Sequence, residues 1–290
     1  MITIRSVLPV LVVLSTLFSA PARAHDGLHE KIVEVTRRIG AEPGRGDLRL
    51  LRSDLYRRHK DWDRAFTDLD RARTLDPNLQ GVEFTRGQIF RDLGWLASAA
   101  AAMDRHLERQ PLDVIALRKR AELASSRSRP GAAVTFYDRL ILAGSPATPD
   151  AYIARAKAQL ATGEGQQATA LEGVEQGIKK LGDAVPLMLF AVDLDRGLQE
   201  WDRALGRIDR LASYSSRRES YHALRGDVLL QAERHGAAEK AYRSCLESIS
   251  LLRTRRRQTD AVQKLEARIR LALDAFPSEP NQSPPTILDP

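Results

Sequence analysis

Two histidines near the start of the chain are the residues whose spacing could support metal chemistry. His25 and His29 are four residues apart, so on a helix both imidazoles would lie on one face. If His25 were the first residue of a processed chain, its free amine would add a third nitrogen, and nitrogen ligands suit copper. This interpretation needs cleavage at one particular bond and an ordered terminus, whereas chain ends usually fray. We therefore expect no metal site and no cofactor.

The first 24 residues have the pattern of a secretory signal peptide. Arg5 provides a positive start, an apolar run from Val7 to Leu14 follows, and Ala22-Arg23-Ala24 is an A-x-A cleavage signal. The apolar run is too short to cross a bilayer, which takes roughly 20 residues. We expect cleavage after Ala24, a periplasmic or secreted protein, and no membrane-spanning segment.

Charge and cysteine content narrow the class of protein further. The formal net charge is +7, and the signal segment holds Arg5 and Arg23 but no acid, so the mature chain would carry +5. In an exported protein this modest excess concerns solubility and acidic partners, and we expect no nucleic-acid ligand. The one cysteine, Cys245, cannot form an intramolecular disulfide. We expect it to be a buried core residue, with a reactive thiol or an intermolecular bridge as the alternative.

Familiar catalytic motifs are missing from the sequence. It has no G-x-S-x-G elbow, no glycine-rich phosphate loop, no C-x-x-C pair and no H-E-x-x-H helix. The basic run Arg255-Arg256-Arg257 is typical of a solvated face, although it could also contact an anion or a protein. His106 is expected to be a partly buried, hydrogen-bonded residue. The sequence therefore predicts no catalytic residue and a protein that is not an enzyme.

A repeat of 34 residues organises the chain instead. Alanines recur at separations of 34, 34, 37, 34 and 34 residues, at Ala65, Ala99, Ala133, Ala170, Ala204 and Ala238. Twelve places before them stand mostly small residues, namely Ser53, Gly87, Ala121, Ala158, Val192 and Gly226. Four places after them stand mostly large apolar residues, namely Leu69, Met103, Tyr137, Val174, Ile208 and Tyr242. Small residues let two antiparallel helices approach closely, and large residues one turn away fill the remaining space.

Each unit is thus predicted to be a helix–turn–helix pair. The units would begin at Gly46, Gln80, Val114, Ala151, Val185 and Glu219. Pro77 and Pro111 would end the second helix of the first two units, because proline cannot continue a helix. We place the three extra residues of the longer spacing in the segment LAGSPATPD.

This pattern resembles the tetratricopeptide repeat family. The first two units carry the resemblance best, through Ser53, Tyr56, Trp62, Ala65, Leu69, Ala72 and Pro77, then Gly87, Phe90, Gly94, Ala99 and Pro111. Later units depart from it: Asp195 stands where a large apolar residue is usual, and the closing proline is lost. The resemblance implies an all-α, right-handed superhelical solenoid of about six repeats over residues 46–252. Capping helices at 25–45 and 253–276 and a flexible, proline-rich tail at 277–290 would complete it.

The resemblance also implies protein–protein interaction through a concave groove lined by the first helix of each unit. The side chains expected to face this groove are Asp54, Arg57, Phe84, Gln88, Arg91, Arg118, Glu122, Arg155, Gln159, Asp193 and Arg196. Its arginines could bind carboxylates of a partner, or pair with acids of neighbouring repeats.

The leading hypothesis is a non-catalytic scaffold of the periplasm or extracellular space that binds a segment of a protein or peptide partner, within an envelope complex. The alternative is an accessory subunit of an exported enzyme or metal-handling system, with His25 binding copper.

Overall fold

The computed structural model describes residues 22–144 and 147–276, which form fifteen α-helices and no strand. The all-α prediction is therefore confirmed. Residues 1–21 of the predicted signal segment and the predicted tail at 277–290 lie outside the described residues. Within the described ranges, no helix combines the length and the apolar character needed to span a bilayer.

Two compact units make up the chain, one up to Arg109 and one from Gln110. The first contains α1 (Ala22–Ala41), the pair α2 (Gly46–Arg58) and α3 (Trp62–Leu75), and the pair α4 (Val82–Asp92) and α5 (Leu96–Arg109). The second begins with α6 (Val114–Ser126) and α7 (Pro130–Ala143), α8 (Pro149–Leu160) and α9 (Gln167–Leu181), and α10 (Val185–Gly197) and α11 (Trp201–Tyr214). It ends with α12 (Arg218–Gln231) and α13 (His235–Ser250), the short α14 (Thr254–Arg257), and α15 (Asp260–Asp274).

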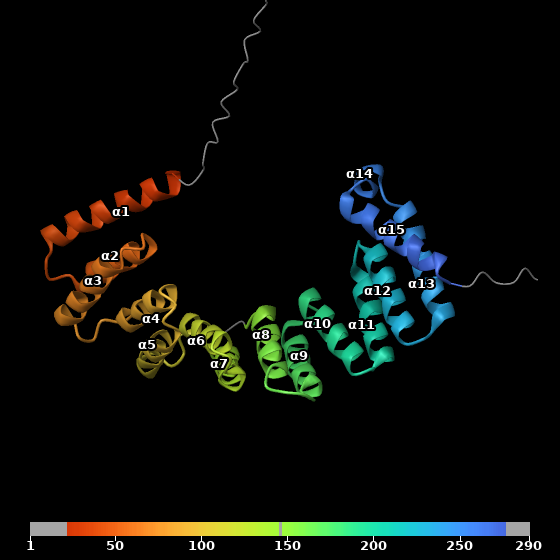
Figure 1. Ribbon diagram of the computed structural model, residues 1–290, viewed down its shortest axis with the longest axis horizontal. Helices are drawn as coiled ribbons and strands as arrows, with labels where there is room; N and C mark the ends of the chain where they lie inside the picture. Colours follow the sequence, from red (N-terminus) through yellow and green to blue (C-terminus); the bar gives the residue numbers. More distant parts are fainter. Residues whose placement is uncertain (1–21, 145–146, 277–290) are drawn as a thin grey trace, which may run out of the picture. The chain divides into compact units, whose positions relative to one another are not determined.

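Within each unit the helices pack mainly against their neighbours along the chain, as Figure 1 lets the reader follow. The first helices of adjacent pairs also touch, α2 with α4 and α8 with α10. Such nearest-neighbour packing is the defining property of a solenoid of repeats. The predicted unit starts fall within two residues of the start of the first helix in every pair.

The spaced alanines lie where the two helices of each pair cross. All six, from Ala65 to Ala238, are 0% exposed. In the first pair the Ser53 hydroxyl donates to the carbonyl oxygen of Ala65 at 2.8 Å. In the second, a Cβ on Gly87 would lie 3.3 Å from the carbonyl oxygen of Ala99. In these two pairs the small residues therefore make the close backbone approach that their spacing predicts.

The turn inside each pair contains a residue with positive φ at one fixed place, five residues before the spaced alanine. These residues are Lys60, Gly94, Ser128, Gly165, Gln199 and Glu233. The amide that follows donates to the carbonyl five residues earlier, as from Asp61 to Tyr56 and from Arg234 to Leu229, both at 2.9 Å. This is the Schellman ending of a helix, which favours glycine at the left-handed position.

The connection between α8 and α9 is longer than the others. It has six residues, 161–166, where the corresponding turn has three in the other five pairs. Gly163 and Gly165 both have positive φ, which lets the longer segment reverse direction. The expectation that the three extra residues lie in LAGSPATPD is therefore wrong, and residues of α8 stand in a different register from that predicted.

The segment after α13 packs its apolar face back onto that helix. Val262 and Ile269 of α15 are buried in one cluster with Cys245 of α13. Thr259, with extended backbone (ψ 140°), separates α14 from α15, so residues 253–276 contain two helices where one was expected. Cys245 is fully buried and free, and burial raises the pKa of its thiol to about 11. These observations support its interpretation as a core residue.

We expect Gly226→Ala to destabilise the second unit by roughly 1–3 kcal/mol, the usual cost of overpacking. The added Cβ would lie 2.3 Å from the Tyr242 ring, and that ring is held in the core. Gly236→Ala is the matched control, since its Cβ would meet nothing within 4 Å in α13. Thermal denaturation of both variants checks this; equal melting temperatures would show that the crossing is not tight.

Glu233→Gly is expected to stabilise the protein by about 1 kcal/mol, because an L-residue in the left-handed conformation costs about that much. Glu233 has φ 59°. Glu247→Gly, in the exposed interior of α13, is the control and should destabilise by roughly 0.5–1 kcal/mol. Denaturant titration followed by circular dichroism measures both, and a loss of stability in the first variant would contradict the turn geometry.

Candidate partner-binding face

In the first unit, one predicted groove arginine joins two successive first helices. Arg57 of α2 donates through Nε to Asp54 at 2.8 Å and through a terminal nitrogen to Asp92 of α4 at 2.5 Å. Burial lowers the pKa of Arg57, but the two carboxylates outweigh burial and raise the pKa overall. Acids of its own pair and of the following pair therefore hold the half-buried Arg57 in place.

In the second unit, Arg196 of α10 makes the same connection. It donates to Asp193 at 3.2 Å and to the side-chain oxygen of Gln231 of α12 at 2.9 Å. In both cases the acceptors lie three residues before and 35 residues after the arginine. The repetition favours the interpretation that groove arginines pair with neighbouring repeats, at least at this position.

Arg155 does not face the groove as predicted. It donates to Asp138 of α7, and its guanidinium lies where a Cβ on Gly173 of α9 would stand. The side chain is thus directed at the two second helices beside it. The cause is the displaced register of α8, which follows from the longer connection to α9. Gln159 likewise donates to Gln166, within that connection.

The remaining predicted groove residues make only local contacts, or no hydrogen bond or ion pair among the described residues. Arg91 donates to its neighbour Asp92 at 2.8 Å, and the Phe84 ring lies 5.3 Å from that of His106, which is buried. Glu122 accepts from Lys119 at 2.9 Å. Gln88 and Arg118 are half-buried and form no hydrogen bond or ion pair with any residue in the described ranges. These two side chains, one in each unit, have side-chain donors that no described residue accepts.

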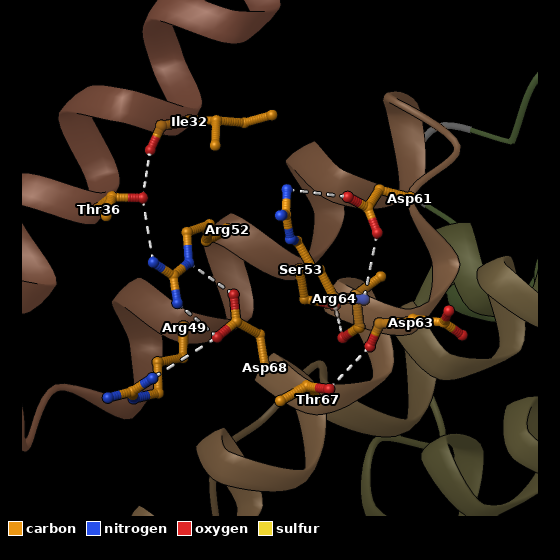
Figure 2. Close-up of polar contacts among 11 residues, drawn as sticks. Ile32, Thr36, Arg49, Arg52, Ser53, Asp61, Asp63, Arg64, Thr67 and Asp68 are labelled. Carbon is orange, nitrogen blue, oxygen red and sulfur yellow. Dashed lines mark hydrogen bonds and ion pairs between the residues drawn. The ribbon is translucent and has the colours of Figure 1, made fainter.

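A buried ion-pair cluster, which the sequence analysis did not find, joins α1, α2 and α3. Asp68 is 3% exposed and accepts two hydrogen bonds from the Arg52 guanidinium, at 2.7 and 2.8 Å. Arg49 approaches the same carboxylate at 3.6 Å, and Arg52 also donates to Thr36 of α1 at 3.0 Å. Figure 2 shows Arg49 and Arg52 directed at Asp68, with Thr36 on the other side of Arg52.

Asp195 has a comparable role in the second unit. Its side chain is fully buried and accepts from Arg203 at 2.5 Å and from Arg207 at 2.7 Å. Arg207 also donates to Glu175 of α9. Asp195 can therefore occupy a position that usually holds an apolar residue, because two arginines of α11 neutralise its charge. An aspartate at this position was the sign in the sequence that a buried ion pair occurs here.

A third type of ion pair recurs between adjacent pairs. Arg86 of α4 donates to Asp70 of α3 at 2.8 Å, and Arg225 of α12 donates to Asp209 of α11 at 2.5 Å. In both cases the arginine stands thirteen residues before the spaced alanine of its own pair. The aspartate stands five residues after the spaced alanine of the preceding pair. These ion pairs could have been predicted from the sequence, because the arginine and the aspartate occupy the same positions of the repeat in both cases.

These arrangements hold helices together and provide polar surfaces. No group of three or more His, Cys, Asp and Glu side chains suited to a metal occurs among the described residues. The side chain of His25 is outside the described set, although the residue itself lies in α1. The chemistry available on the first helices is hydrogen bonding and charge pairing with another chain.

Paired helices that contact their chain neighbours define a helical-repeat protein, a class whose surfaces bind other proteins. The match to a family model then gives the particular family: residues 84–152 match a tetratricopeptide repeat model. The matched region is thus of the tetratricopeptide repeat family, as its residues suggested, and the helix pairs of the described residues have the fold of a helical-repeat solenoid. The number of repeats outside the matched region stays a prediction. No curated protein matches the sequence.

Several solved structures are similar to this chain at low sequence identity. The structure of Naa15/Naa10 bound to HypK-THB is 18% identical, with a TM-score of 0.52, over 86% of this chain and 37% of that one. YrrB, titled a TPR protein with an unusual peptide-binding site, is 11% identical with a TM-score of 0.48, over 70% of this chain and 97% of that one. A tetratricopeptide repeat protein from Parabacteroides merdae ATCC 43184 is 15% identical with a TM-score of 0.46, over 86% of this chain and 94% of that one.

We expect Asp68→Asn to destabilise the first unit by roughly 3–5 kcal/mol, because it leaves two partly buried arginines without their buried counter-charge. Asp70→Asn is the control on the same helix: its side chain is 59% exposed and its ion pairs should contribute less than about 1 kcal/mol. Unfolding by guanidinium chloride, followed by circular dichroism, compares the two. A loss no larger for the buried acid than for the exposed one would contradict the assignment.

Proposed function

We propose that this protein is a non-catalytic scaffold of the periplasm or extracellular space that binds a segment of a partner protein on its first helices. The observation that carries the proposal is the combination of tetratricopeptide repeats with polar side chains on these helices that lack an internal partner. Gln88 in the first unit and Arg118 in the second have this property. An amide and a guanidinium can hydrogen-bond to the backbone and carboxylates of an extended segment.

The proposed location rests on the sequence. Arg5, the apolar run and Ala22-Arg23-Ala24 together form a secretory signal. Expression of the full chain followed by fractionation and N-terminal sequencing tests this point. The expected result is a mature protein that starts at His25; an intact Met1 in the cytosolic fraction would contradict it.

The binding face can be tested by site-specific photo-crosslinking in the native host. A photo-reactive amino acid at Gln88 or Arg118 should capture the same partner, identified by mass spectrometry. The controls are Arg71 of α3 and Thr135 of α7, exposed residues on the second helices. If these control positions capture that partner as efficiently, the first helices are not the binding face.

Arg118→Ala and Arg196→Ala should separate binding from stability. Because Arg118 has no internal ion pair, its loss should weaken binding of the captured partner about tenfold, the equivalent of one hydrogen bond to a charged group. Its melting temperature should hardly change. Arg196→Ala removes a tie between α10 and α12, so the melting temperature should fall slightly. Titration calorimetry and thermal melts on both variants provide the comparison, and unchanged affinity for Arg118→Ala would count against this face.

A further inference from the structure

A hollow of about 330 Å³ lies among α11, α12 and α13 of the second unit. Its floor is apolar, formed by Ile208, Leu229 and Ala241, one from each helix, all buried. Four lining residues belong to α12, namely Tyr221, His222, Arg225 and Leu229. Their successive spacings of one, three and four residues place them on one face of the helix. The volume is at the lower end of the range for ligand sites, about 300–1,000 Å³, and suits a few side chains.

This hollow is on the side of α12 away from the predicted groove. Counted from the predicted unit starts, the predicted groove residues stand at places five, nine and twelve of their units. The α12 residues that line the hollow stand at places three, four, seven and eleven of the unit that begins at Glu219. At 3.6 residues per turn these two sets point in nearly opposite directions. The hollow therefore lies outside the face of the proposed function.

The same place in the second pair is filled by an ion pair. Arg105 of α5 donates to Glu83 of α4 at 2.7 Å. In the last pair Ser244 takes the position of Arg105, six residues after the spaced alanine. His222 takes the position of Glu83, sixteen residues before the spaced alanine. A short hydroxyl replaces the long arginine and an imidazole replaces the carboxylate. Arginine also occupies the Ser244 position in three further pairs, at Arg71, Arg139 and Arg210.

The lining carries more positive than negative charge. Lys240 of α13 is exposed at the rim, and it forms no hydrogen bond or ion pair with residues in the described part of the chain. The same is true of His222 and Ser244. Arg225 uses one terminal nitrogen to bind Asp209, the one acid of the lining, and its other donors face no described acceptor. A lysine, an arginine and a hydroxyl around an apolar floor suit a carboxylate attached to an apolar group.

We propose that this hollow is a second binding site, which takes an acidic side chain flanked by apolar residues from a partner polypeptide. Lys240 and Arg225 would bind the carboxylate, and Ser244 would add a hydroxyl donor. The neighbouring apolar side chains would lie on Ile208, Leu229 and Ala241. Asp209 keeps Arg225 in place through its ion pair, so the guanidinium is already oriented before the ligand arrives.

The test uses the full-length mature protein and a capped peptide, acetyl-Ala-Leu-Glu-Leu-Ala-amide, with a second peptide in which Gln replaces Glu. Nuclear magnetic resonance of the labelled protein follows backbone amides during titration. The expected result is saturable shifts in α11, α12 and α13 with the Glu peptide and at least tenfold weaker binding of the Gln peptide. Equal binding of the two peptides would overturn the proposal.

Ser244→Arg and Ser250→Arg form the matched pair of variants. Both add one positive charge to α13, so non-specific attraction of an anion would persist or increase in both. Only Ser244→Arg fills the hollow, with the residue type that four other pairs carry at this position. We expect it to abolish binding of the Glu peptide, while Ser250→Arg binds normally.

Lys240→Gln should lower the affinity for the Glu peptide about tenfold. It should leave the fold intact, because Lys240 is exposed and has no partner among the described residues. Circular dichroism of each variant checks folding. Binding that survives Ser244→Arg in a folded protein would overturn the proposal. Free glutarate separates the two sources of a carboxylate: if it binds as tightly as the Glu peptide, the assignment to a polypeptide ligand is wrong.

Discussion

The close approach of two helix backbones at each spaced alanine is the constraint on which the rest of the structure depends. Ala65 receives the hydroxyl of Ser53 on its carbonyl oxygen, and Gly226 leaves room for the ring of Tyr242 and for nothing more. Once two helices are this close, the next turn must hold large apolar side chains to fill the remaining space. The three-residue turns and their left-handed residues follow, because they return the chain at the required separation.

Charge is distributed over this framework by the same periodicity. Arginines at fixed repeat positions join one pair to the next, at Arg57, Arg86, Arg196 and Arg225. Buried acids such as Asp68 and Asp195 collect two arginines each. Hence much of the arginine content stabilises the array, and the side chains that have no internal partner are the informative ones for binding. A charged residue is evidence for a ligand here only after its internal partners have been counted.

The sequence predicted the fold because the crossing residues are small, periodic and local. It predicted Ala99 and Met103 as contacts across one pair, and both are fully buried. It did not place the extra residues between α8 and α9, because residue spacing alone cannot distinguish a longer turn from a longer connection between pairs. Arg155 was therefore assigned to the wrong face. The ion pairs were missed for another reason: which acid a long, flexible guanidinium reaches depends on three-dimensional packing.

The positions of the extra residues show what the array tolerates. The turn of six residues between α8 and α9 leaves Ala170 fully buried and keeps α8 packed on α9. Each pair closes through contacts about a dozen residues apart in sequence, so little chain entropy is lost before a contact forms. A chain with such short-range contacts is expected to fold quickly and from several starting points. It can also gain, lose or lengthen a pair during evolution while its neighbours keep their own cores, which makes the repeat, rather than the whole chain, the unit on which selection acts.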